Sequence, residues 1–164
     1  AAERTSETPS EISEGTVSGT AKEQEITEMR EKTEEGRQAV LRYVEALNQY
    51  NNDPETDRSV FKELECADVY EHKQKLMSAR GPCEHQVIRF WEPEEVDGKA
   101  QERDTNSHIF QWEETWGKKI EPEDVIILYA DYCVKTPPEE TVHEGYKFIL
   151  HREDGAWKMA GFGY

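Results

Sequence analysis

Large side chains recur every three or four positions along the first third of the chain, as they do on one face of an α-helix. The pattern is strong over residues 37–51 and weakens upstream. The members of this face are Ile26, Met29, Thr33, Gly36, Val40, Tyr43, Leu47 and Tyr50. We therefore predict a helix over residues 33–51, preceded by a fraying helical extension over residues 20–32 that opens with the capping-box sequence Thr20-Ala-Lys-Glu23.

Two shorter helical segments are predicted next. Asp53 and Pro54 suit the N-cap and the first turn of the first segment. Its apolar residues at helical spacing are Val60, Phe61 and Leu64. The second segment, residues 69–79, ends before Gly81 and Pro82, and the pattern leaves open whether the two segments form one helix.

After these helices the apolar period becomes two, which is typical of β-strands. Residues 87–91 are β-branched and aromatic and form the first predicted strand, and the Asp-Gly pair at 97–98 suits a hairpin turn. Residues 125–134 form a long predicted strand that is apolar on both faces except at Asp131.

The segment 109–116 fits two structures. Its alternation of aromatic and polar residues favours a strand, whereas the spacing of Ile109, Trp112 and Trp116 also fits a helix that ends at Gly117. We predict the strand.

Two strands close the chain. Residues 142–151 alternate apolar and polar, a turn follows at residues 153–155, and residues 156–164 form the last strand. This order predicts an α+β fold in which N-terminal helices pack on a curved antiparallel sheet of four to five strands.

The N-terminal part of the chain differs in composition from the rest. Residues 1–35 contain no aromatic residue, ten Glu and four Lys or Arg, which gives −6 of the chain's net charge of −16. Such a segment buries too little apolar surface to offset the entropy lost on ordering. We predict that residues 1–19 form a flexible acidic tail, and that residues 33–164 form a single domain.

The net charge of −16 argues against nucleic acid or an anionic membrane surface as a partner. No apolar run approaches the length of a transmembrane helix, so no membrane span is predicted. The polar leader, rich in Ser, Thr and Glu, is typical of an exported protein that has lost its signal or lipid anchor. We expect an extracytoplasmic location with lipid anchoring at the cell surface, and a cytoplasmic location is the alternative.

The three cysteines carry little information. Cys66 and Cys83 flank a predicted helix and could pair in an oxidising compartment, while Cys133 lies in an apolar strand and is predicted to be a buried thiol. No pair of His, Cys or carboxylate residues has metal-ligand spacing on a predicted element. We predict neither a metal nor a cofactor.

Asp131 is the strongest candidate for a general base, because a carboxylate among apolar neighbours is expected to have a raised pKa. The alternative is that Asp131 faces outward or pairs with a Lys or Arg on an adjacent strand. His143 and His151 share a strand parity with Lys147, and this parity predicts that both face solvent.

The chain has more aromatic residues than a polar surface requires, and most of them are predicted to form the core. A few are predicted to line a concave cleft, where Tyr and Trp offer apolar area and one polar group each. The predicted pocket residues are Tyr43, Trp91, His108, Trp112 and Tyr146, with His108 as a hydrogen-bond donor. We expect such a pocket to hold a small apolar ligand.

The C-terminal segment 146–162 reads Tyr-Lys-Phe-Ile-Leu-His-Arg-Glu-Asp-Gly-Ala-Trp-Lys-Met-Ala-Gly-Phe. It resembles the C-terminal hairpin of the nuclear transport factor 2-like (cystatin-like) superfamily. The resemblance implies a cone-shaped fold with a long first helix. It also implies either an isomerase, dehydratase or cyclase that acts in the cone, or a non-enzymatic module such as the exported domains of bacterial cell-wall and secretion machinery.

From these features we expect a non-enzymatic exported binding or assembly domain that engages a protein partner or a small ligand through its sheet or concave cleft. A small pocket enzyme with Asp131 or a His as general base is the alternative, and a structural spacer is a third class. Because residues 125–134 are apolar on both faces, we also predict that both faces of the sheet are covered. A homodimer or a protein partner would cover the second face; the tail helix or a hairpin over residues 91–116 is the intrachain alternative.

Overall fold

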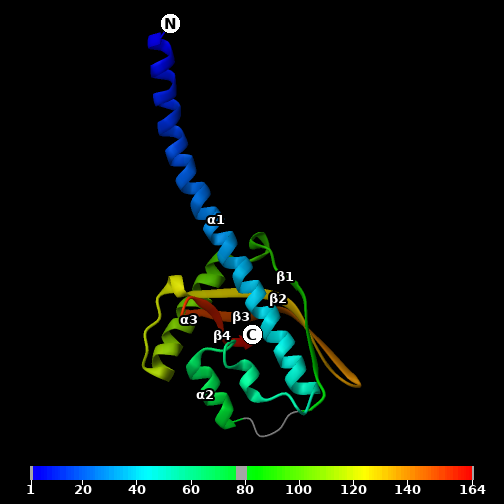
Figure 1. Ribbon diagram of the computed structural model, residues 1–164. Helices are drawn as coiled ribbons and strands as arrows, with labels where there is room; N and C mark the ends of the chain where they lie inside the picture. Colours follow the sequence, from blue (N-terminus) through cyan, green and yellow to red (C-terminus); the bar gives the residue numbers. More distant parts are fainter. Residues whose placement is uncertain (1, 77–80, 164) are drawn as a thin grey trace. The chain divides into compact units, whose positions relative to one another are not determined.

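The computed structural model describes residues 2–76 and 81–163, of which residues 2–19 and 73–76 are described by their backbone alone. Its fold is α+β, as predicted (Figure 1). N-terminal helices pack on a four-stranded antiparallel sheet that does not close into a barrel.

The chain divides into two compact units, Ala1–Glu34 and Glu35–Tyr164, and helix α1 (Ala2–Asn52) passes from the first into the second. In the first unit Ile26 and Met29, which the sequence places on the apolar face of the helix, are 52% and 61% exposed. Among the described residues, no helix has the length and apolar character required to cross a membrane.

Deletion of residues 1–19 is expected to change the melting temperature by less than a few degrees, because the segment has little apolar surface to bury. Thermal unfolding followed by circular dichroism measures this. A deletion that extends through Tyr43 is the control: it removes Val40 and Tyr43, which are buried in the core, and should abolish the cooperative transition. A large drop for the shorter deletion would show that the tail packs on the domain.

The sheet is a meander in which each strand pairs with the next along the chain. Its strands are β1 (Glu84–Phe90), β2 (Val125–Thr136), β3 (Glu139–Glu153) and β4 (Ala156–Gly163). Strands β3 and β4 meet at a tight turn in which Asp154 and Gly155 both have positive φ. The predicted strands over residues 125–134 and 142–151 and the turn at 153–155 are therefore confirmed, while Tyr164 lies outside the described residues.

One face of the sheet packs against the second half of α1 and forms the main core. The buried residues of α1 are Ala39, Val40, Tyr43, Val44 and Ala46, and those of the sheet are Ile126, Leu128, Ala130, Tyr132, Phe148, Leu150, Trp157 and Met159. At Gly36 a Cβ atom would lie only 3.3 Å from Leu128 Cδ1. The glycine in the apolar face therefore lets the helix approach the sheet closely.

The strand predicted over residues 109–116 is wrong, because these residues belong to helix α3 (Gly98–Trp116). The side chain of Asp97 caps the helix by accepting hydrogen bonds from the amides of Lys99 and Ala100 at 3.0 and 3.4 Å. Gly117 ends the helix in the left-handed conformation, with a φ of 66°. The Asp-Gly pair predicted as a hairpin turn is thus the start of a helix.

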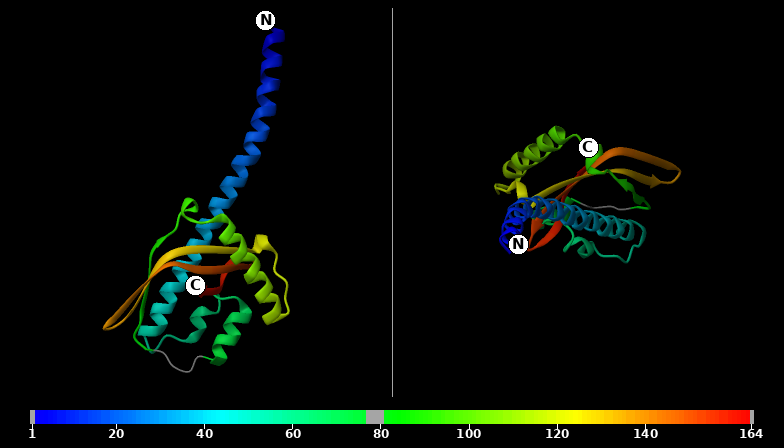
Figure 2. Two further views of the ribbon diagram at one scale, coloured as in Figure 1. Left: turned by 180° about the vertical axis from the view of Figure 1, so that it is seen from behind. Right: turned by 90° about the horizontal axis from the view of Figure 1, so that it is seen from above.

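Helix α3 covers the face of the sheet opposite to α1. The views in Figure 2 place α1 and α3 on opposite sides of the strands. The side chain of Gln101 donates to the backbone oxygen of Ile127 on β2 at 3.1 Å, and Tyr129 on the same strand donates to Asp104 at 2.7 Å. The prediction that both faces are covered is confirmed, and the cover on the second face comes from the same chain, as a helix instead of the hairpin considered from sequence.

The segment after α1 is less helical than predicted. The helix start predicted at Asp53 is wrong. The Asp53 side chain accepts hydrogen bonds from the amide of Glu55 and the hydroxyl of Thr56, which closes a turn at the end of α1. A short 3₁₀ helix, η1 (Arg58–Phe61), follows, and then α2 (Ala67–Leu76). Residues 77–79 of the predicted second segment lie outside the described residues.

Candidate functional site

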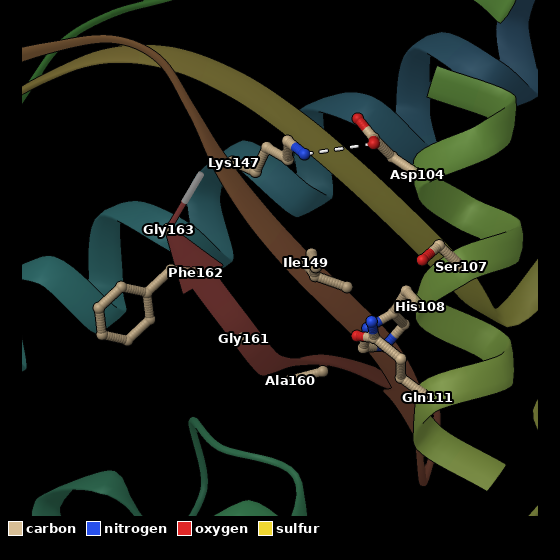
Figure 3. A pocket seen from close by; sticks show the side chains of 10 residues that line it. All are labelled: Asp104, Ser107, His108, Gln111, Lys147, Ile149, Ala160, Gly161, Phe162 and Gly163. Atoms are coloured by element: carbon tan, nitrogen blue, oxygen red, sulfur yellow. Dashed lines mark ion pairs between the residues drawn. The ribbon is translucent and has the colours of Figure 1, made fainter. Parts of the chain in front are cut away.

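A pocket of about 350 Å³ lies between α3 and the last two strands. Its polar side chains come from both sides of the gap (Figure 3). Asp104, Ser107, His108 and Gln111 project from α3, and Lys147 projects from β3. The remaining lining residues are Ile149, Ala160, Gly161, Phe162 and Gly163. The ring of Phe162 points away from α3, so the floor of the pocket is formed by small residues and Ile149.

Glycine on β4 is what leaves this space open. A Cβ atom built on Gly161 would meet no heavy atom within 4 Å. Gly161 pairs with Ile149, and Gly163 pairs with Lys147, whose side chains both line the pocket. A side chain at either glycine would therefore project from the same face of the sheet toward α3. The φ of Gly161 is not positive, so backbone conformation does not require glycine there.

The charged groups of the pocket neutralise each other. Lys147 Nζ lies 3.2 Å from one carboxylate oxygen of Asp104, and the Tyr129 hydroxyl donates to the other at 2.7 Å. Burial acts to raise the pKa of Asp104, but the hydrogen bonds from Tyr129 and Lys147 outweigh it and hold this pKa below its usual range. Burial and the nearby Asp104 raise the pKa of Tyr129. Asp104 therefore stays ionised, while Tyr129 stays protonated.

His108 and His151 form a hydrogen-bonded pair at the edge of the pocket, with their Nε2 atoms 2.6 Å apart. Burial lowers the pKa of both imidazoles, and charge on His108 lowers that of His151 further, to about 3. The prediction that His151 faces solvent is wrong, since its side chain is only 1% exposed. The strand parity was correct, but α3 packs over that face.

Trp112 lies beside the same histidine pair, with its ring centroid 4.4 Å from that of His151. It is buried in a second cluster with Cys66, Val69 and Ala160. Trp112 and His151 also line a second pocket of about 420 Å³ at the other end of α3. The pair therefore separates two pockets: His108 lines one and His151 lines the other.

Two other predicted pocket residues belong to the core on the α1 side of the sheet. Tyr43 is buried, and its hydroxyl donates to Glu65 at 3.3 Å. Tyr146 stacks on Tyr132 with ring centroids 4.7 Å apart and an interplanar angle of 15°. Side chains of the core thus occupy the space between α1 and the sheet around both residues.

Asp131 and Trp91 lie together near the first strand, away from the pocket. The Asp131 carboxylate accepts hydrogen bonds from Arg89 Nε at 3.0 Å and from Trp91 Nε1 at 2.8 Å. Arg89 lies on the adjacent strand β1 and also binds Glu95 through two hydrogen bonds. This is the arrangement that the sequence offered as the alternative to a catalytic Asp131.

The residues that build the pocket are mostly ones that sequence reasoning missed. Of the predicted site residues, only His108 lines it. Asp104 and Gln111 were missed because their segment was not recognised as one continuous helix, on which they and His108 lie one turn apart. The available signal was Asp97 followed nineteen positions later by Trp116 and the capping Gly117.

The cysteines and the metal-binding residue types add no further site. All three cysteines are free, and Cys133 is buried as predicted. In the described part of the chain, no three His, Cys, Asp or Glu side chains are grouped so that they could hold a metal ion.

No protein-family model matches this chain, and no match was found among curated proteins or solved structures.

Proposed function

We propose that this protein is a non-enzymatic binding domain that holds a small, uncharged polar molecule in the pocket between α3, β3 and β4. The observation that carries the proposal is the glycine-opened space of about 350 Å³ toward which polar side chains converge from a helix and a strand. Sites for small ligands have volumes of roughly 300–1,000 Å³ and a few well-placed polar groups.

The charges of the lining favour an uncharged ligand. Asp104 and Lys147 compensate each other, and His108 is neutral at physiological pH because burial lowers its pKa. A charged ligand would therefore lose its hydration without gaining an unpaired opposite charge. Ser107, Gln111 and the remaining N–H groups of Lys147 supply donors for hydroxyl or carbonyl oxygens. Because the lining contains both polar and apolar residues, we propose a polar ligand in place of the apolar ligand expected from the sequence.

The surroundings of Asp131 favour binding over catalysis. A general base must lie within hydrogen-bond reach of a substrate proton, and Asp131 does not line the pocket between α3, β3 and β4. Both carboxylate oxygens of Asp131 accept hydrogen bonds from neighbouring side chains, Arg89 and Trp91. Asp131 is therefore proposed as a structural residue that ties β1 to β2.

Amide chemical shifts of the ¹⁵N-labelled full chain, titrated with acetamide, glycerol or myo-inositol, test the proposal. We expect shifts confined to residues 104–111, 147–149 and 160–163, with dissociation constants on the order of 1 mM for such small probes. Gly161→Leu should abolish them, because a Cβ atom at this position meets no heavy atom within 4 Å and the leucine side chain then extends into the pocket. The absence of shifts for all three probes in the unmodified protein would refute the proposal.

Gly98→Leu is the matched control for this experiment. A Cβ atom at Gly98 also meets nothing within 4 Å, and its φ is not positive, but it lies at the first turn of α3, outside the pocket lining. The Gly98→Leu variant should bind the probes with the same affinity as the unmodified protein. Equal loss of binding in both variants would show that the added leucine, and not the filled pocket, causes the effect.

We also propose that the domain belongs to the nuclear transport factor 2-like superfamily and acts in an extracytoplasmic compartment. The support for the family is the placement of segment 146–162 as the β3–β4 hairpin at the end of the sheet, with a long first helix packed on it. The support for export is the polar leader alone. Fractionation of the source cells with an antibody to the domain tests the location, and recovery only in the cytosol would refute it.

A homodimer remains a proposal with weaker support. The dimer prediction depends on a second face of the sheet that nothing within the chain covers, whereas α3 covers that face. Sedimentation equilibrium at micromolar concentration tests it, and a single species at the mass of 19.1 kDa would refute it.

A further inference from the structure

The His108–His151 pair restricts where protons can lie. Two Nε2 atoms 2.6 Å apart form a hydrogen bond only if one carries a proton and the other offers its lone pair. A neutral pair meets this condition, with the second proton on Nδ1 of the accepting ring. One added proton, placed on Nδ1 of the donating ring, leaves the bond intact. A second added proton would make two N–H groups face each other, and the bond would be lost.

The surroundings decide which ring takes the first added proton. On the side of His108 the pocket contains the compensated pair Asp104 and Lys147. His151 is the more deeply buried of the two histidines, and the charge of His108 acts against a charge on it. In the described part of the chain, neither imidazole has a hydrogen bond to a carboxylate.

Several charged groups line the second pocket on the far side of His151. They are Asp68, Lys118, Lys119, Glu121, Asp124, Arg152, Glu153 and Asp154. Lys118 is paired with Asp68 at 2.9 Å, and Glu153 accepts from the amide of Ala67 at 3.2 Å. The five acids exceed the three bases by two. None of these groups is among the causes that shift the pKa of His151, which burial and the charge of His108 both lower. The first added proton is therefore expected on His108.

We propose that the ligand pocket contains an acid switch: on mild acidification His108 takes up one proton, His151 remains neutral as the acceptor of its Nε2–H, and the pocket changes from uncharged to cationic. This inference rests on the proposed function, since it concerns the same pocket. In its cationic state the pocket holds His108 and Lys147 against the single carboxylate of Asp104. The net positive charge favours binding of a small carboxylate, for which the neutral state has a lower affinity.

Proton uptake and carboxylate binding are thermodynamically linked. If protonation of His108 raises the affinity for a carboxylate by some factor, the bound carboxylate raises the affinity of His108 for its proton by the same factor. Couplings of this kind are commonly on the order of tenfold. The pair therefore makes ligand choice depend on pH, with no rearrangement of the sheet, as long as only one proton is added.

Long-range ¹H–¹⁵N correlation spectra of the imidazoles, recorded without ligand from about pH 7 to about pH 4, test the first step. Near neutral pH we expect a proton on the Nε2 of one ring and none on the Nε2 of the other. At lower pH we expect the imidazolium signature for His108, while His151 stays neutral. Titration of both rings together near their ordinary value of about 6.5 would overturn the proposal. His143→Gln, on the same strand as His151, is the control and should leave both curves unchanged.

Binding of formate, whose carboxyl remains mostly ionised at about pH 5, tests the second step. Its affinity should rise on the order of tenfold between about pH 7 and about pH 5. His108→Gln should remove this rise, and Gly161→Leu should remove formate binding at both values. A formate affinity that does not change with pH in the unmodified protein would overturn the switch. Failure of the uncharged probes alone would instead refute the proposed function, because the imidazole titration requires no ligand.

Discussion

Replacing Glu65 with glutamine is expected to lower the free energy of unfolding by about 3–5 kcal/mol, the range for breaking a buried ion pair. The Glu65 side chain is fully buried and accepts hydrogen bonds from Arg58 Nη2 at 2.8 Å and from the Tyr43 hydroxyl at 3.3 Å. Arg58 is itself 11% exposed and stacks over Phe61. Glutamine keeps the volume of the side chain but removes the charge that compensates this guanidinium. Urea denaturation measures the loss.

Glu63→Gln is the matched control for this prediction. Glu63 pairs with Lys158 at 3.5 Å, but its side chain is 85% exposed. Exposed pairs contribute about 0–1 kcal/mol, so the control should remain close to the unmodified protein. Equal effects at the two positions would show that the Arg58–Glu65 pair is not desolvated as the structure implies. The double variant Arg58→Met, Glu65→Leu should recover most of the loss, because it leaves no buried charge without a partner.

Phe148→Ala is expected to cost about 3–5 kcal/mol of unfolding free energy, through lost burial and the cavity left in the core. Phe148 lies on β3 and is 1% exposed. Its ring contacts Tyr132 and Tyr146, with centroids 5.3 and 5.4 Å away. These neighbours are fixed by the sheet and by α1, so the site can close over the missing ring only in part.

Phe110→Ala provides the comparison, because Phe110 is 62% exposed on α3. The same substitution there should change the unfolding free energy by no more than about 0.5 kcal/mol. Denaturation curves of the two variants should therefore share their slope and differ in their midpoints. A midpoint for Phe148→Ala as high as that for Phe110→Ala would contradict the assignment of Phe148 to the core.

The elements that the sequence predicted correctly are those whose signals are local. The three-four spacing through Val40 and Tyr43 defines the buried face of α1, and the alternation before Asp154 and Gly155 defines the β3–β4 hairpin. Both patterns follow from backbone periods of 3.6 and 2 residues, which neighbouring positions reveal without knowledge of the fold.

The helix α3 shows where local signals become ambiguous. Trp112 and Trp116 are four positions apart, and this spacing fits the same side of a helix and also the same side of a strand. The two ends of the segment favour the helix. The Asp97 side chain accepts hydrogen bonds from amides of the first turn, and Gly117 adopts the left-handed conformation that ends the helix. Asp-Gly is equally suited to a hairpin turn, so the pair alone did not distinguish the two structures.

The sequence by itself thus determined the α+β class, the apolar face of α1 and the two C-terminal strands, because period, caps and turns act between residues a few positions apart. Only the tertiary structure decided what covers the second face of the sheet. That choice buries His151 beside His108, which is 43 positions away, and aligns Asp104 with Lys147 across the space left by Gly161. Burial and proximity of this kind depend on which distant elements pack together, and no local pattern of side chains encodes that.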